Sequence, residues 1–194
     1  MEIAQALLHL ASGTTEQAQE ILDHGAIPAL IKLLESSRNE VLGQAMWTLA
    51  NIAAEDEKFR NIVVNTGALI PLIKVMNEYG EDKTLIQTGT RALSNLCQGK
   101  PSLPLDAIKD VVPVIARVIM TQENVEVLSD ALWALSYSSE GSNSEERIQM
   151  ILDTGVAPYL VKYLAQSFLA PPSVKIIGNI LAGNNEQGNV GFSL

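Results

Sequence analysis

The stretch AMWTLANIAAE, residues 45–55, returns in modified form along the whole chain. The other copies are IAQALLHLASG (3–13), TRALSNLCQGK (90–100), ALWALSYSSEG (131–141) and VKIIGNILAGN (174–184). Aligned on one polar position, they place His9, Asn51, Asn95, Tyr137 and Asn179 at intervals of 42, 44, 42 and 42 residues. A period of this length indicates stacked repeats, each of which buries its apolar face against its neighbours.

Each repeat is predicted to be helical. Around Trp47 the apolar residues recur every three or four positions, at Leu42, Ala45, Met46, Leu49, Ile52 and Ala53, which is the stripe of a buried helix face. A second phrase runs out of phase with the first, as HGAIPALIKLL (24–34), TGALIPLIKVM (66–76), KDVVPVIARVI (109–119) and TGVAPYLVKYL (154–164). Its small residue followed by proline predicts the end of one helix and the start of the next. Short segments such as 15–23 and 57–65 add a third helix to a repeat.

The predicted fold class is therefore an all-α solenoid. Its expected parts are a partial repeat at 1–13, full repeats at 14–55, 56–99, 100–141 and 142–183, and a flexible tail at 184–194. No alternating pattern of apolar and polar residues competes with the helical one.

Composition narrows the possible partners. The chain has 194 residues, 13 Lys+Arg and 22 Asp+Glu, and its net charge of −9 disfavours nucleic acid and favours a basic partner. The single cysteine, Cys97, cannot form an internal disulfide, which fits a reducing compartment. Neither a signal peptide nor an apolar run of roughly 18 residues is present, so we expect the cytoplasm and nucleus and no membrane partner.

The candidate binding residues lie off the apolar stripe. Trp47 and Asn51 are one helical turn apart, so repeats stacked roughly 8 to 10 Å apart would form a ladder of such pairs along a concave surface. An asparagine amide can pair with the backbone of an extended peptide without reading its sequence. An indole face can pack the methylene stem of a lysine or arginine. The ladder residues are Trp47, Asn51, Asn95, Trp133 and Asn179, and the nearby carboxylates are Glu55, Glu126, Asp130 and Glu140.

Period, helix count and phrases together resemble armadillo repeats. The segments DHGAIPALIKLL, QAMWTLANIAAE, LSNLCQGKP and DALWALSYSSEG resemble importin alpha, a family of adaptors that read nuclear localisation signals, from its second to its sixth repeat. The resemblance covers residues 1–183. It implies a right-handed armadillo solenoid without enzymatic activity, which binds basic nuclear-localisation-signal peptides in an extended conformation for import into the nucleus. It also implies that Gln44, Glu55, Asp130 and Gly13 help to receive the basic side chains.

The chain departs from the family pattern in the binding ladder. Gln5 and Arg91 stand where the family presents indole rings, and His9 replaces the first ladder asparagine. Arg91 adds positive charge where a ligand lysine should enter, so we expect weakened binding of short basic peptides. The family's N-terminal basic segment, which binds importin beta, has no counterpart before Met1, and this makes importin beta a doubtful partner.

Other interpretations stay open at this point. A tryptophan at helical spacing is often core, an asparagine near a helix end is often a cap, and acidic residues often only solvate a surface. The alternative function is an armadillo-repeat interaction scaffold that has lost signal binding. Catalysis has little support, because the two histidines form no known motif and we expect Cys97 to be buried packing. No cofactor or metal site is predicted.

Overall fold

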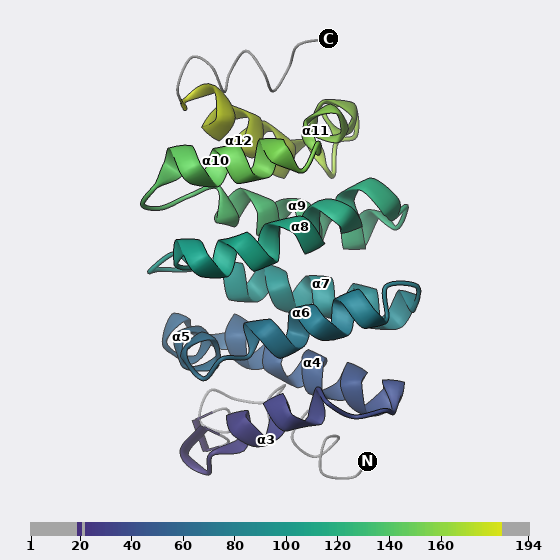
Figure 1. Cartoon of the computed structure of the whole chain (residues 1–194), viewed down its shortest axis with the longest axis vertical. Coiled ribbons are helices and arrows are strands. Elements are labelled where there is room, and N and C mark those ends of the chain that lie inside the picture. The colour runs from purple at the N-terminus through teal and green to yellow at the C-terminus, as the bar shows by residue number, and fades with distance from the viewer. Residues whose placement is uncertain (1–18, 21, 184–194) are drawn as a thin grey trace. The chain divides into compact units, whose positions relative to one another are not determined.

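The computed structural model describes residues 19, 20 and 22–183, and all regular structure in these residues is helical (Figure 1). The all-α prediction is therefore confirmed. The chain divides into two compact units, Met1–Gly99 and Lys100–Leu194, which are described one at a time. The predictions for Gln5, His9, Gly13 and the tail at 184–194 lie outside the described residues.

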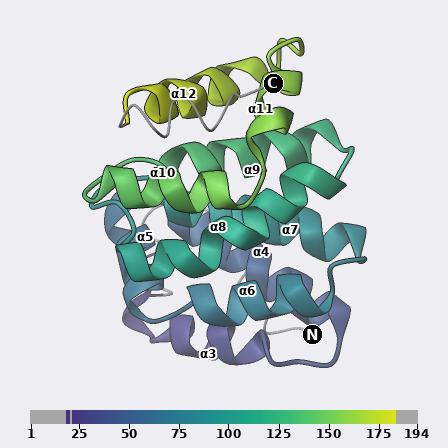
Figure 2. The same ribbon diagram turned by 45° about the horizontal axis from the view of Figure 1, so that its top comes forward.

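The first unit contains five helices among its described residues. They are α3 (Ala26–Leu33), α4 (Asn39–Glu55), α5 (Glu57–Asn65), α6 (Leu69–Glu78) and α7 (Lys83–Cys97). The long helices α4 and α7 lie side by side (Figures 1 and 2). The predicted stripe of α4 is buried between its neighbours, since Leu42, Ala45 and Leu49 are fully inaccessible to solvent.

The second unit also contains five described helices. They are α8 (Leu105–Thr121), α9 (Val125–Ser138), α10 (Ser144–Asp153), α11 (Ala157–Tyr163) and α12 (Ala170–Leu181). The helix α9 packs against both α8 and α12. Helices α4 and α7 begin 44 residues apart, and α9 and α12 begin 45 residues apart, so each unit repeats one long helix at the period seen in the sequence.

In the copies of the second phrase a helix ends at a glycine, with one exception. Gly67 and Gly155 have φ values of 89° and 74°, a left-handed conformation that ends one helix and lets the next begin. The break predicted between residues 109 and 113 is wrong, because α8 runs through both Asp110 and Pro113. The reason is local: Asp110 stands where the other copies have glycine, it keeps a helical conformation, and Pro113 is tolerated inside α8.

Two buried arginines attach the short helices α5 and α10 to the neighbouring backbone by hydrogen bonds. Arg60 on α5 is 2% exposed and its Nε donates to the carbonyl oxygen of Leu96 at 2.8 Å. Arg147 on α10 is 1% exposed and donates to three carbonyl oxygens, those of Ser142, Ser138 and Leu103, at 2.7, 3.3 and 2.6 Å. Burial lowers the pKa of both guanidinium groups. Each arginine thereby satisfies carbonyls that the helix packing removes from water.

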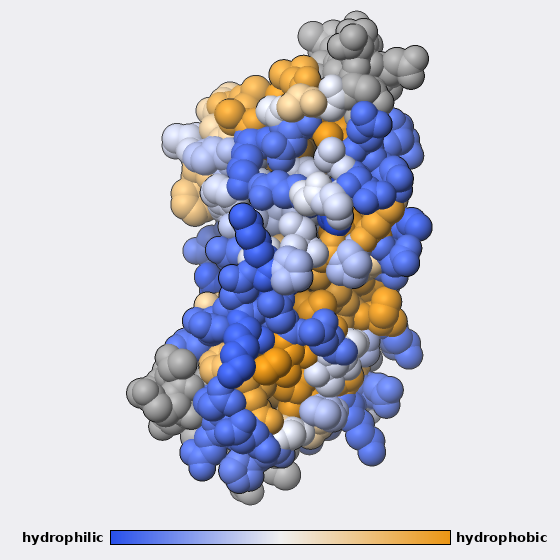
Figure 3. All heavy atoms as spheres, turned by 90° about the vertical axis from the view of Figure 1, so that its left-hand side faces the viewer, coloured by the Kyte–Doolittle hydropathy of each residue, from blue (hydrophilic) through white to orange (hydrophobic). Residues whose placement is uncertain are grey.

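Figure 3 shows one side of the molecule, on which hydrophilic residues surround several apolar areas. Among the described residues, the most exposed large apolar side chains are Phe168, Leu181, Ile70 and Val174. No single helix in the described ranges is long and apolar enough to cross a membrane; α5 and α6 pass that test only as a pair, which is bent by 75°.

Candidate functional site

The helix α4 carries four of the predicted binding residues. Gln44, Trp47 and Asn51 are half-buried and follow one another at intervals of about one turn, and Glu55 is the exposed last residue of the helix. They occupy this edge of α4 because the apolar stripe of the helix faces the core. Gly13, another of the predicted binding residues, lies outside the described residues.

The helix α7 places the Asn95 side chain against the backbone of α4. The Nδ2 of Asn95 donates to the carbonyl oxygen of Ala50 at 2.9 Å, one residue before Asn51 on the neighbouring helix. The amide therefore uses one of its two hydrogens to join two repeats, and keeps one donor and its acceptor oxygen. The helix α7 ends at Cys97 with Gln98 as its C-cap, so the interpretation of Asn95 as a helix cap is wrong.

The indole of Trp47 has a cation of the same chain on its face. The guanidinium of Arg91, which lies one turn before Asn95 on α7, is 5.7 Å from the centre of the Trp47 ring. This distance is within the range of a cation–π contact, worth about 0.5–1 kcal/mol at an exposed site. Arg91 thus occupies one face of the Trp47 ring.

The second unit repeats this arrangement around Trp133. The rings of Trp133 and Tyr137, one turn apart on α9, stack with their centres 5.8 Å apart. The Nζ of Lys175 on α12 is 5.9 Å from the Trp133 centroid and 5.5 Å from the Tyr137 centroid. The same Nζ lies 2.6 Å from Oε1 of Glu140. Lys175 therefore makes with its own chain the contacts that the sequence analysis expected of a ligand lysine.

The pKa of the Tyr137 hydroxyl is raised, chiefly by burial. Burial raises the pKa of its hydroxyl, the ammonium of Lys175 lowers it, and the carboxylate of Glu140 raises it. The sequence analysis missed the contact of Lys175 with the two rings. The sequence repeat could have indicated this contact, because Lys175 and Arg91 both lie one helical turn before a ladder asparagine.

Asn179 and Asp130 complete the second unit's set of predicted residues. The Nδ2 of Asn179 donates to Oγ of Ser139 at 2.7 Å, so this amide also joins two repeats. The helix α12 continues to Leu181, which excludes a capping role for Asn179. Asp130 is half-buried on α9 about one turn before Trp133.

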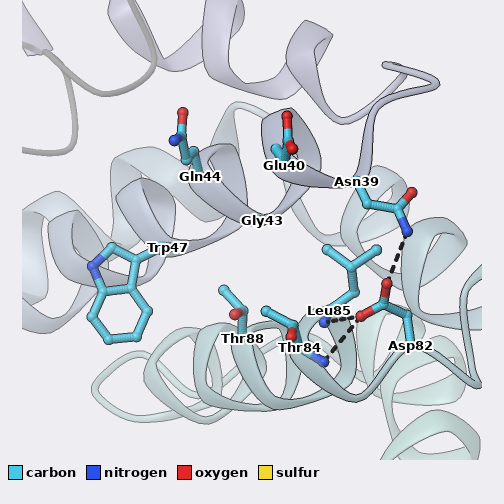
Figure 4. A pocket seen from close by; sticks show the side chains of 9 residues that line it. All are labelled: Asn39, Glu40, Gly43, Gln44, Trp47, Asp82, Thr84, Leu85 and Thr88. Atoms are coloured by element: carbon cyan, nitrogen blue, oxygen red, sulfur yellow. Dashed lines mark hydrogen bonds between the residues drawn. The ribbon is translucent and has the colours of Figure 1, made fainter. Parts of the chain in front are cut away.

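A cavity of about 510 Å³ opens between α4 and α7, next to Trp47. We call it the Gly43 pocket, and its lining residues are Asn39, Glu40, Gly43, Gln44, Trp47, Asp82, Thr84, Leu85 and Thr88. Figure 4 shows Trp47 at one end and the hydrogen-bonded Asn39 and Asp82 at the other. Of these residues the sequence analysis named only Gln44 and Trp47, because a pocket formed across two helices leaves no motif in either helix.

Cys97, Ser138 and Ser139 are buried and pack or form hydrogen bonds within their own units. Cys97 is 2% exposed, as expected for a packing residue. The hydroxyls of Ser138 and Ser139 donate to the carbonyl oxygens of Ala134 and Ser136. His24 is exposed, and its Nδ1 lies 2.9 Å from the carbonyl oxygen of Glu20. Among the residues that the structure describes, no group of three or more His, Cys, Asp or Glu side chains could hold a metal ion.

The chain is an armadillo-repeat protein. Residues 14–54 match the armadillo/beta-catenin-like repeat family. Computationally designed armadillo repeat proteins for modular peptide recognition superpose with a TM-score of 0.82 at 29% identity, over 95% of this chain and 76% of that one. A designed armadillo repeat protein in complex with the peptide (KR)4 gives a TM-score of 0.80, also at 29% identity, over 96% of this chain and 77% of that one.

The chain is, more particularly, a homologue of importin alpha. It is 41% identical to importin subunit alpha-2 of Arabidopsis thaliana over 84% of its own length and 30% of that protein. It is 41% identical to importin subunit alpha-1a of Oryza sativa subsp. japonica over 96% of its own length and 35% of that protein. The chain thus spans about a third of the length of these relatives.

Proposed function

We propose that the protein binds basic nuclear localisation signals in an extended conformation, as an importin-alpha-like adaptor for import into the nucleus. Its binding surfaces are the α4–α7 face of the first unit and the α9–α12 face of the second. The observation that carries the proposal is the pairing, within each unit, of a half-buried tryptophan with an asparagine amide on the adjacent long helix. Cytoplasm and nucleus are the corresponding locations.

The spacing of the long helices suits an extended peptide. Packed helices lie roughly 8 to 10 Å apart, and an extended chain rises about 3.3 Å per residue, so one repeat matches about every third peptide residue. The remaining donor and acceptor of Asn95 can pair with the peptide backbone at this interval, and we assign Asn51 and Asn179 the same role. The net charge of −9 attracts a basic ligand.

Internal cations set the affinity of this site. Arg91 covers the Trp47 indole and Lys175 covers the Trp133 and Tyr137 rings, so a ligand cation has to displace them or enter beside them. Each displaced cation–π contact costs about 0.5–1 kcal/mol. We therefore propose weaker binding of short basic peptides than an arrangement with open indoles would give.

A titration at low salt tests the proposal. A fluorescently labelled (KR)4 peptide is added to the protein while its anisotropy is followed, with an acidic peptide of equal length as the control. Saturable binding that is lost in the double variant Trp47→Ala, Asn51→Ala supports the function. An absence of saturable binding up to tens of micromolar protein overturns it.

The internal cations also favour a second candidate function. A protein whose indoles are covered by its own Arg91 and Lys175 could act as an armadillo interaction scaffold without signal binding. The same double variant separates the two functions in a pull-down from lysate. Capture of the same partners by the variant and by the unaltered protein favours the scaffold, and their loss favours the adaptor.

A further inference from the structure

Arg91, which covers one face of the Trp47 ring, is not among the residues that line the Gly43 pocket. The pocket begins at the Trp47 side chain and runs along α4 toward the N-terminal ends of α4 and α7 (Figure 4). Its volume of about 510 Å³ lies within the 300–1,000 Å³ range of ligand pockets. A basic side chain that cannot bind the indole face covered by Arg91 can therefore enter the adjacent Gly43 pocket.

Gly43 keeps this pocket open although packing does not require a glycine there. A Cβ at Gly43 would meet only Cδ2 of Leu85, at 3.6 Å, which is an ordinary contact. Gly89 on α7 differs, because a Cβ there would come within 2.7 Å of Cγ of Met76. A glycine inside a helix costs about 0.5–1 kcal/mol relative to alanine. At Gly43 no close packing compensates this cost. The missing side chain leaves space between α4 and α7.

The pocket has the electrostatics of a cation site. One oxygen of the Asp82 carboxylate accepts from the backbone N–H groups of Thr84 and Leu85, both at 3.0 Å, and the other accepts from Nδ2 of Asn39 at 2.8 Å. These bonds lower the pKa of Asp82, so the group is ionised at neutral pH. Within residues 22–183 its hydrogen-bond partners are all neutral, and its charge is not compensated by an ion pair.

The other lining residues add acceptors and no positive charge. None of the described residues that line the pocket is Lys, Arg or His. Glu40 supplies a second carboxylate, whose ion pair with Arg38 at 3.1 Å is exposed and therefore weak. Thr84, Thr88 and Gln44 supply further oxygen atoms around the same space.

We propose that the Gly43 pocket is the subsite of the first unit for a lysine or arginine side chain of the bound peptide. The aliphatic stem of that side chain lies along the edge of Trp47, and its charged head lies between the carboxylates of Asp82 and Glu40. The assignment rests on the proposed function and specifies where that ligand's cation binds. In this protein the carboxylate-lined pocket replaces the indole face that Arg91 covers.

Two pocket variants and two matched controls test the subsite by anisotropy titration with labelled (KR)4. Asp82→Asn removes the charge and keeps the helix cap, because asparagine caps as well as aspartate. Glu81→Gln removes the same charge from the adjacent exposed residue that does not line the pocket. Gly43→Met fills the pocket with a good helix former, and Gly43→Ala adds only the Cβ that fits.

The expected result is at least a fivefold loss of affinity for Asp82→Asn and for Gly43→Met, with both controls within twofold of the unaltered protein. A circular-dichroism melt checks that the variants stay folded, and Asp82→Asn decides alone if Gly43→Met does not. If the unaltered protein binds (KR)4 and the pocket variants bind it equally well, the subsite is refuted and the adaptor function stands. If the unaltered protein does not bind, both are refuted.

Discussion

Replacement of Lys175 by methionine should tighten the binding of basic peptides to the second unit. Lys175 makes two cation–π contacts, at 5.9 and 5.5 Å, and one ion pair with Glu140 in which the two side chains are 44% and 40% exposed. At such exposure a cation–π contact is worth about 0.5–1 kcal/mol and the ion pair about 0.2–1 kcal/mol. A ligand cation that takes this position has to displace these contacts. Without Lys175 the affinity should rise by about 1–3 kcal/mol, or roughly 5- to 160-fold.

The assay is the (KR)4 titration at fixed low ionic strength, with Lys162→Met as the matched control. Lys162 lies on α11, 5.6 Å from the ring centre of Tyr163, so its removal changes the charge of the same unit equally and leaves Trp133 unaltered. A gain for Lys175→Met that clearly exceeds the gain for Lys162→Met supports the displacement mechanism. Equal gains would mean that only net charge matters, and would refute it.

Four further outcomes are expected. Arg91→Trp should tighten (KR)4 binding about two- to fivefold in the same titration, and unchanged or weaker binding would count against Trp47 as a contact. Asn95→Ala should weaken peptide binding and, through the lost bond to a neighbouring helix, lower stability in urea by about 1 kcal/mol. Arg147→Met removes three hydrogen bonds to carbonyl oxygens and should cost about 3 kcal/mol or more; a urea midpoint like that of the unaltered protein would contradict this. The pKa of Asp82 is lower in the folded protein than in the unfolded chain. Ionised Asp82 therefore stabilises the fold fully above the unfolded pKa of about 3.9, and this contribution is lost as the pH falls through the folded pKa. Asp82→Asn should therefore reduce the loss of folding free energy at acidic pH in a pH-stability curve.

Most of the fold could be predicted from the sequence because its determinants are local and repeated. The apolar stripe of α4 is fixed by the 3.6-residue helical period, and the structure buries Leu42, Ala45 and Leu49 accordingly. The helix ends at Gly67 and Gly155 follow from a conformation that glycine adopts readily. The small residue followed by proline predicts a helix break in every copy of the second phrase. In the third copy Asp110 replaces glycine and stays helical, so α8 continues through Pro113.

The candidate site could be predicted only in part. The one-turn spacing of Trp47 and Asn51 puts both residues on one edge of α4, and this much follows from the sequence. The bond from Asn95 to the carbonyl of Ala50 and the stacking of Arg91 on Trp47 depend on distances between neighbouring helices. Such distances depend on how whole helices pack, and no short motif encodes them.

The Gly43 pocket could not be predicted from the sequence either. A glycine within a helical phrase is usually interpreted as a weak helix position or a close contact. Only the three-dimensional arrangement shows that Gly43 has room for a side chain while Gly89, on the adjacent helix, does not. The glycine at position 43 can be assigned to a pocket only when the atoms around it are known.

The side-chain amide resonances of the asparagines test the central claim most directly. In ¹⁵N-labelled protein titrated with (KR)4, the NH₂ signals of Asn51 and Asn95 should shift progressively and saturate together. The signals of Asn65 and Asn77, exposed on α5 and α6, should stay in place. Unmoved signals from Asn51 and Asn95 at saturating peptide, or shifts confined to Asn65 and Asn77, would contradict peptide binding along the α4–α7 face.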